Sequence, residues 1–149
     1  MINVSGHDQV MRNLQKLGVD VERAVKEAVS VTAQGVRGVA VKSIQSRSYG
    51  HPSKRSRQGG GTYTTIASKP GDPPNTDTGR LVSSIAVEPM QPSTTMYVGT
   101  SVEYGRWLEF GTGTMAERPW LQPALQRNEK VLTQQLTAAI QRQIDKAAE

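Results

Sequence analysis

The chain contains no cysteine and only two histidines, His7 and His51, which lie far apart in different contexts. The absence of cysteine excludes a disulfide framework and any metal site built from thiolates. Two separated histidines leave little from which to build a histidine zinc site or a catalytic triad. We therefore expect no metal and no other cofactor.

Large apolar side chains are also scarce: the hydrophobic fraction is 36%, with one Phe, two Trp and four Tyr in 149 residues. No stretch approaches the ~20 apolar residues that span a bilayer, and no basic start followed by an apolar run marks a secretory signal. We expect a soluble single domain over residues 1–149, with no membrane partner. A chain with so few large apolar side chains often buries part of its apolar surface against partner proteins.

The net charge of +5 is concentrated in one segment, residues 42–80, which holds seven basic and two acidic side chains. Such a segment is expected near nucleic acid or an acidic partner, and a solvated surface loop is the alternative. The candidate contacts to a DNA channel or an acidic partner are Lys54, Arg55, Arg57 and Lys69.

Hydrophobic periodicity predicts two helices in the first third of the chain, after a short strand at residues 2–4. Ser5 and Asp8 have capping-box spacing, and Gly18 stands where a C-terminal glycine cap belongs. A second helix then runs from Asp20 with an apolar stripe that repeats every 3.6 residues as far as Ile44. Gly35 and Gly38 within it indicate either close approach of a packed helix or neighbouring subunit, or a local kink.

Residues 47–75 predict a long, basic, Gly- and Pro-rich loop, far longer than the usual ~4–6-residue connection. Only residues 63–67 favour extended structure, as a short hairpin arm. In the second half of the chain, the pattern predicts a helix over 81–85 capped from Thr76–Thr78, followed by strands over 85–90 and 95–100 around a turn at 91–94. It then predicts a helix over 104–110 that ends at Gly111, a short strand over 112–115, and a long helix from Leu121 to Ile144. The fold class is α+β, with a small antiparallel sheet packed against two long helices and a protruding basic loop.

Catalytic signatures are missing. Gly59–Gly61 lacks the lysine and helix of a phosphate-binding loop. Asp72 and Asp77 offer oxygen ligands for Mg²⁺, but a turn-shaping Asp72 and a helix-capping Asp77 are the favoured interpretation. Glu103 and Glu109 lie six residues apart and do not share a helix face, so paired acid–base chemistry is not expected. We expect Glu109 to pair with Arg106 or Arg118, and we expect no enzyme.

Three segments occur in a fixed order. The first is Pro74-Asn75-Thr76-Asp77-Thr78-Gly79-Arg80-Leu81-Val82-Ser83-Ser84-Ile85, the second runs from Tyr104 through Glu109-Phe110-Gly111-Thr112, and the third is Arg118-Pro119-Trp120-Leu121-Gln122-Pro123-Ala124. Together they resemble the tail-completion, or tail-component, family of long-tailed bacteriophages. Pro74 stands one residue further from Thr78-Gly79 than is usual in that family, and Trp120 stands where Phe is common.

The resemblance implies a structural protein of the virion neck, assembled in the host cytoplasm, that helps to close the tail tube and join it to the head. It implies a ring of copies, often sixfold, between the head–tail connector and the tail terminator or tail tube, near the genomic DNA. Some residues of the last two segments would fill the core, while others would anchor subunit or partner interfaces, where Trp and Arg are enriched. The interface candidates are Tyr104, Trp107, Glu109, Phe110, Thr112, Arg118 and Trp120.

Two other classes of function compete with this interpretation. A small basic nucleic-acid-binding protein would use Lys54, Arg55 and Arg57, and it would bind DNA with a steep dependence on salt. The segment lacks the regularly spaced aromatics that stack on single strands. An enzyme such as a nuclease would need a carboxylate cluster, which the sequence does not supply.

Overall fold

The computed structural model describes residues 7–91 and 94–148. The strand predicted at residues 2–4 and the centre of the turn predicted at 91–94 lie outside the described residues. Within the described residues, no helix is long and apolar enough to cross a membrane.

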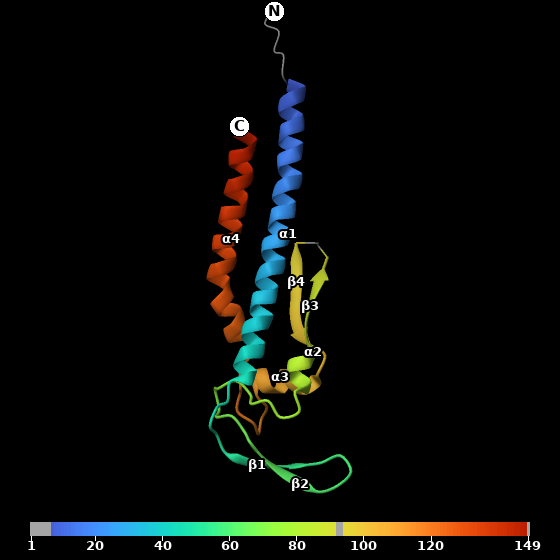
Figure 1. The fold of residues 1–149 in the computed structure, drawn as a ribbon, viewed down its shortest axis with the longest axis vertical. Coiled ribbons are helices and arrows are strands. Elements are labelled where there is room, and N and C mark those ends of the chain that lie inside the picture. The colour runs from blue at the N-terminus through green and yellow to red at the C-terminus, as the bar shows by residue number, and fades with distance from the viewer. Residues whose placement is uncertain (1–6, 92–93, 149) are drawn as a thin grey trace, which may run out of the picture.

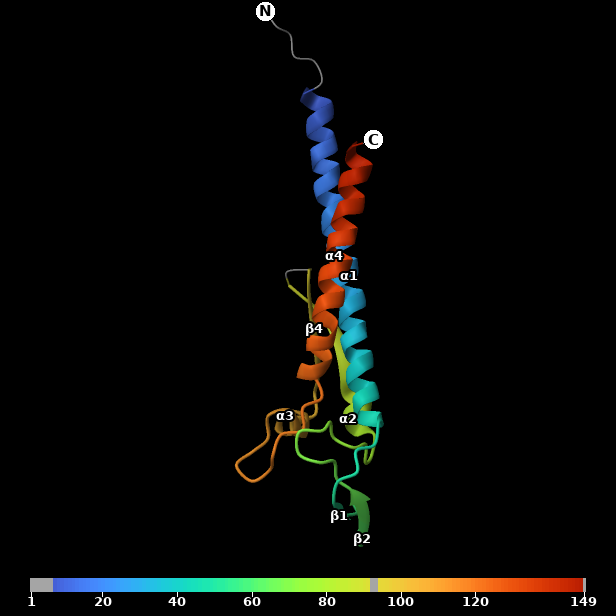
Figure 2. The ribbon, with the colours of Figure 1, turned by 90° about the vertical axis from the view of Figure 1, so that its left-hand side faces the viewer.

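Two long helices form the body of the molecule. Helix α1 (His7–Gln45) is 39 residues long, and helix α4 (Gln122–Ala148) has 27 residues. The two lie side by side and run in opposite directions, with α1 extending further at the end where the termini lie (Figures 1 and 2). Their contact includes a hydrogen bond of 3.1 Å between Thr32 Oγ1 and Gln135 Oε1. We refer to this antiparallel pair as the helical arm.

Helix α1 corrects the prediction of two helices separated at Gly18. Gly18 has no positive φ and lies inside the continuous helix, so it does not act as a C-terminal cap. Gly35 does mark a close approach: a Cβ there would lie 2.8 Å from Asn128 Oδ1 of α4. The space beside Gly38 is open. The prediction of a tightly packed helix is therefore confirmed at one of the two glycines.

Strands β3 (Ile85–Met90) and β4 (Thr95–Thr100) form an antiparallel pair with the predicted bounds, and Ile85 lies opposite Thr100 and Val87 opposite Val98. The pair packs against α1, which lies between it and α4 (Figure 1). Because side chains alternate along a strand, Ile85 and Val98 share the face that meets the core. The buried core consists of Val36, Ala40, Ile44, Leu81, Ile85, Trp120 and Ala124.

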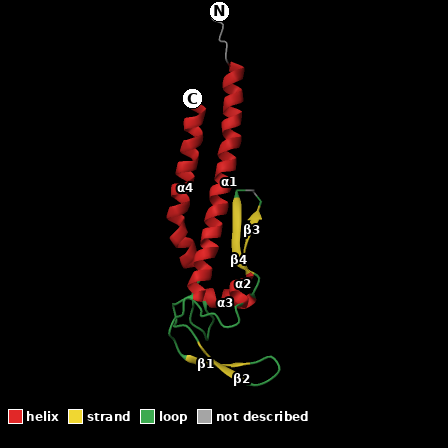
Figure 3. Cartoon of the chain, viewed as in Figure 1, coloured by secondary structure: helices red, strands yellow, loops and turns green. Residues whose placement is uncertain are grey.

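The segment predicted as a continuous loop contains a second, separate hairpin. Strands β1 (Pro52–Ser56) and β2 (Thr62–Ile66) pair antiparallel at the end of the molecule opposite the termini, as the two yellow hairpins in Figure 3 show. Gly59, Gly60 and Gly61 all have positive φ and make its turn. The sequence predicted extended structure at β2 but not its partner, because β1 has no apolar alternation. The chain is thus mixed, with two two-stranded sheets, which agrees with an α+β class.

Two short helices connect the sheet to the arm. Helix α2 (Arg80–Ser84) begins after Gly79, whose φ is 76°, with no side-chain cap, so the prediction that Asp77 caps it is wrong. Helix α3 (Glu103–Phe110) ends at Gly111 as predicted. The strand predicted at 112–115 is a tight turn closed by one bridge between Thr112 and Met115.

Gly18→Ala tests the continuous helix. A Cβ at Gly18 meets nothing within 4 Å, so alanine removes a helix-destabilising glycine without a clash. We expect local stability to rise by about 0.5–1 kcal/mol, seen as slower amide hydrogen exchange around Leu14–Val21. We expect Gly111→Ala, in contrast, to lower the stability, because the φ of 70° at Gly111 strains any L side chain. Faster exchange in Gly18→Ala would show that the helix is interrupted there.

Candidate functional site at the junction of α3 and α4

The segment Tyr104–Leu125, which carries two of the three motif segments, is organised by the side chain of Glu109. This carboxylate is only 7% exposed. Its Oε2 accepts hydrogen bonds from the backbone N–H groups of Trp120 (2.8 Å) and Leu121 (2.9 Å), and its Oε1 accepts one from Gln122 (2.8 Å). We call this arrangement the Glu109 clasp.

The clasp acts as a helix cap supplied from a different helix. The first N–H groups of a helix have no intrahelical partner and lie at the positive end of its dipole, so a carboxylate stabilises them. Pro123 in the first turn lacks an N–H and needs no partner. The first intrahelical bond of α4 joins Leu125 N–H to Leu121 O at 2.9 Å. The prediction that Glu109 forms an ion pair with Arg106 or Arg118 is therefore wrong for the described residues, because the carboxylate accepts hydrogen bonds from three N–H groups instead.

Trp120 is also an internal residue. It is 2% exposed, packs with Leu81 and Ala124, and donates its Nε1–H to Gly105 O at 3.1 Å. A Cβ at Gly105 would lie 3.1 Å from Leu81 Cδ1, so α3 meets the core through its backbone at that position. The sequence left open whether each clustered aromatic fills the core or anchors an interface. Trp120 fills the core, so its prediction as an interface residue is corrected.

Gly111 starts the turn that returns the chain from α3 to α4. A Cβ at Gly111 would lie 2.7 Å from Met115 O, so only glycine fits both the φ and the space. Thr112 satisfies a backbone group of this turn, since its Oγ1 accepts from Met115 N–H at 3.1 Å. Arg118 N–H donates to Leu108 O at 2.7 Å, and Arg118 Nε donates to Ser68 O at 3.3 Å. Arg118 thus joins this turn to the loop that follows β2.

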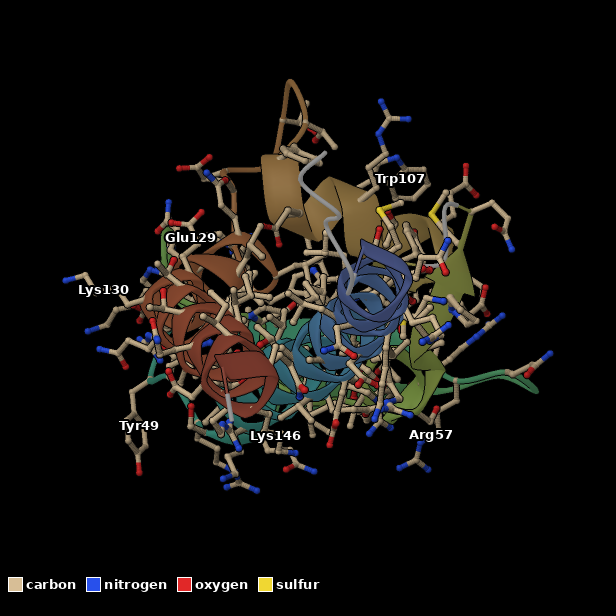
Figure 4. All side chains as sticks on the ribbon, turned by 90° about the horizontal axis from the view of Figure 1, so that it is seen from above. Tyr49, Arg57, Trp107, Glu129, Lys130 and Lys146 are labelled. Carbon is tan, nitrogen blue, oxygen red and sulfur yellow. The ribbon has the colours of Figure 1, made fainter. Side chains whose placement is uncertain are left out.

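The outward face of α3 carries the exposed aromatics. Trp107 is 47% exposed and Phe110 is 69% exposed, and Figure 4 shows Trp107 directed away from the helical arm. Arg106 and Thr112 are exposed beside them, whereas Tyr104 is half-buried against the core. Glu109 and Gly105 occupy the opposite, buried side of the same helix. Of the seven interface candidates, three are exposed (Trp107, Phe110 and Thr112), two are half-buried (Tyr104 and Arg118) and two are buried (Glu109 and Trp120).

The basic residues predicted as one contact surface are not all brought together. Arg55 lies opposite Tyr63 in the β1–β2 register, and the Arg57 guanidinium sits 5.7 Å from the Tyr63 ring centroid. Tyr63 OH donates to Asp77 Oδ2 at 2.7 Å, and Arg55 lies 4.0 Å from the same oxygen. Lys54, one residue from Arg55 along β1, projects from the other face of the hairpin. Lys69 lies beyond the hairpin and is exposed.

The residues that hold the loop after β2 were not identified from the sequence as functional. Asn75 Oδ1 accepts from Ser48 N–H at 2.8 Å, and its Nδ2 donates to Ser48 O and Ile66 O at 2.7 and 2.9 Å. Asp72 Oδ2 accepts from Ser48 Oγ at 2.5 Å, which agrees with a turn-shaping role. Nothing local distinguishes Asn75 in a Pro-Asn-Thr sequence from an ordinary loop residue. No group of three or more His, Asp or Glu side chains in the described part of the chain is placed to hold a metal ion.

A groove of about 920 Å³ opens between the β1–β2 hairpin, the loop after it, and helices α2 and α3. Its lining combines apolar side chains with basic ones, among them Val82, Leu108, Met115, Arg55, Arg80 and Arg118. The groove brings together parts of all three motif segments. No sequence pattern indicates this groove, because its lining residues come from segments that are separate in the chain.

Glu109→Gln tests the clasp. A neutral amide has one acceptor oxygen in place of two, so at least one N–H ahead of α4 loses its partner. We expect the free energy of unfolding to fall by about 2–3 kcal/mol in urea denaturation at neutral pH. The matched control is Glu117→Gln, an exposed carboxylate in the adjoining turn, with an expected change within about 0.5 kcal/mol. Equal effects of the two substitutions would show that the clasp contributes nothing.

The tie between the hairpin and Asp77 predicts a pH effect. The hydrogen bond to the Asp77 carboxylate, with burial as a smaller cause, raises the pKa of the Tyr63 phenol above its usual value near 10. A phenol with a raised folded-state pKa stabilises the fold fully below the ordinary value, and this contribution is lost as pH rises through the folded pKa. We expect Asp77→Asn to lower the Tyr63 pKa in an ultraviolet titration, with Tyr63→Phe identifying its signal. An unchanged pKa in Asp77→Asn would contradict the contact.

Comparison with known proteins gives one family. No curated protein and no solved structure matches the chain. The family model described as "Bacteriophage HK97-gp10, putative tail-component" matches residues 8–111, which is more than half of the chain. The match covers α1, both hairpins, α2 and α3 with Glu109, and it ends at Gly111. The chain belongs to the HK97-gp10-like family of bacteriophage tail components.

Proposed function

We propose that this tail component works at the neck of the particle, where a ring of copies completes the tail and joins it to the head. In this proposal the protein is a non-catalytic building block with six copies, or a multiple of six, per virion. Its neighbours are the head–tail connector, the tail terminator and the tail tube. The coarser statement, a structural virion protein of the tail, follows from its family.

The observation that carries the proposal is the outward face of α3. Trp107 and Phe110 lie three residues apart on one side of the helix, with Arg106 beside them, and all three are exposed. Trp and Arg are the residue types most enriched among those that dominate binding energy at protein interfaces. The inward face of the same helix is used by Glu109 and Gly105 for the fold. Among the described residues, Trp107 and Phe110 take no part in the buried core.

The helical arm supports the same conclusion. Apolar side chains remain exposed along both of its helices: Met11, Leu14, Val19, Val31, Leu125, Val131 and Ile144. A monomer that functions alone rarely leaves so many large apolar groups along one elongated element, whereas an assembly subunit buries them against neighbours. This agrees with the small core, which the composition already indicated.

The nucleic-acid-binding alternative receives less support. Arg55 and Arg57 contact Asp77 and Tyr63 within the chain, and Lys54 faces the other way. The positive charge is therefore partly neutralised and divided between two faces of the hairpin. A DNA-binding protein would show tight binding that weakens steeply with salt and is lost on replacing these three residues.

Trp107→Ala with Phe110→Ala tests the assembly face. Both residues are exposed, so we expect the purified double variant to keep its helix content and unfolding midpoint. Assembly should fail, with the yield of joined, infectious particles falling about tenfold or more, because aromatic hot spots commonly contribute ~2 kcal/mol or more each. Tyr49→Ala is the control, since Tyr49 is a 77% exposed aromatic outside α3.

Quantitative mass measurement of purified particles completes this test. Six copies, or a multiple, agree with the proposed ring. A single copy per particle, or normal particle yield from the α3 double variant, would contradict it.

A further inference from the structure

The groove beside α2 and α3 contains positive charge without a matching negative charge. Arg80 and Arg118 line it, and neither forms an ion pair with any carboxylate of the described residues. Asp77, the acidic side chain in the lining, already accepts from Tyr63 OH and lies beside Arg55. Arg118 Nε and Nη1 donate to the carbonyls of Ser68 and Ala116, but no described carboxylate balances the charge of either guanidinium. Such a groove attracts carboxylate or phosphate, which bind guanidinium through paired hydrogen bonds.

The wall of the groove around Ser68 is fixed by the fold. Ser68 is 3% exposed, lines the groove, and its Oγ is the buried side-chain polar atom that has no hydrogen-bond partner among the described residues. The backbone around it is fixed: Arg118 Nε binds its carbonyl, and a Cβ at Gly50 would clash with the Ala67 carbonyl. The Ser68 Oγ atom has less than 1 Å² of accessible surface, so Ser68 belongs to the packed wall of the groove and offers no hydrogen bond to a ligand.

The floor of the groove selects the class of ligand. Leu81, Leu108, Met115 and the Trp107 ring contribute apolar surface next to the arginines. A volume of about 920 Å³ lies within the ~300–1,000 Å³ range of pockets that enclose a ligand. A DNA duplex offers phosphates but no apolar groups for this floor. A polypeptide offers carboxylates, apolar side chains and backbone groups together.

A second copy of this chain does not supply such a segment. Asp72 and Asp77, the acidic residues of its segment between α1 and α2, are both engaged within the chain. Most of its remaining carboxylates lie in helices. Outside the helices, Glu88 and Glu117 are isolated carboxylates and Glu117 is followed by Arg118, so an acidic segment of a different protein fits the groove better.

We propose that this groove binds an extended acidic segment of a neighbouring virion protein. Carboxylates of that segment pair with Arg80 and Arg118, and its apolar side chains pack on Leu108 and Met115. The inference rests on the proposed function, because it takes the partner from the proteins next to this one in the particle. It assigns the partner's chemistry and the surface that receives it.

Site-specific photo-crosslinking in infected cells tests this with the full chain. A p-benzoylphenylalanine residue is placed at Ile66, which lines the groove and is 45% exposed, or at Tyr49, which does not line it. Mass spectrometry then identifies the crosslinked peptide. We expect Ile66 to capture one segment of another phage protein, with an excess of Asp and Glu, and Tyr49 not to capture it.

Charge variants then show whether the groove's arginines hold that segment. Arg80→Gln with Arg118→Gln should reduce the crosslink at least about tenfold, and Arg80→Gln alone, which leaves the Arg118 contacts intact, about threefold or more. Lys54→Gln with Lys69→Gln removes the same charge outside the groove and should leave the crosslink within about twofold. Equal loss in both double variants would overturn the proposal, since only overall charge would then matter.

The other possible crosslinking results also test the proposal. Crosslinks to DNA, to the chain's own sequence, to a neutral or basic segment, or to no partner overturn the acidic-segment proposal. Failure of the proposed function is recognised separately, because the chain would then be missing from purified particles. The same crosslinking in infected cells would still report what the groove binds.

Discussion

The fold of this tail component depends on one buried carboxylate that binds three consecutive N–H groups. Glu109 on α3 holds the backbone of Trp120, Leu121 and Gln122 and thereby fixes where α4 begins. The position of α4 determines how it packs along α1, and the Trp120 side chain enters the core at the same point. A carboxylate is suited to this because it accepts several hydrogen bonds and favours the positive end of a helix. Without the clasp, the Trp120 indole and the Arg118 backbone would still hold α3 near the start of α4, but three N–H groups would lose their partner.

The clasp also explains why α3 presents two kinds of chemistry. Gly105 and Glu109 face inward, where close backbone packing and hydrogen bonding leave no room for change. Trp107 and Phe110 face outward and make little use of the chain's own core. A rigid inner face orients the outer one, so an interface on α3 would be preorganised rather than assembled on contact. The motif that indicates the family is therefore mainly a folding motif that displays two aromatics.

The sequence predicted what depends on local pattern. Strands β3 and β4 and the end of α3 at Gly111 were predicted correctly, because alternation, turn residues and a terminal glycine act over a few positions. The interruption at Gly18 was wrong, since packing and helix cooperativity override the preference of one glycine. Strand β1 has no apolar pattern and forms only by pairing with β2.

The site was predictable in position but not in its roles. The motif located the α3–α4 junction, yet Glu109 was expected to meet Arg106 or Arg118, three and nine residues away. Its actual partners are backbone groups whose availability depends on where α4 starts, which side-chain types do not reveal. The groove and the partnerless Ser68 hydroxyl arise where segments distant in sequence meet. They could not be found without the fold.

An image of the intact particle at side-chain resolution tests the central claim, that the Glu109 clasp is internal while the outward face of α3 makes contacts between proteins. We expect density for Glu109 against the start of α4 in every copy, with Trp107 and Phe110 buried against a neighbouring subunit or neck protein. Copies in which Trp107 and Phe110 face solvent while the particle is fully joined would contradict the account.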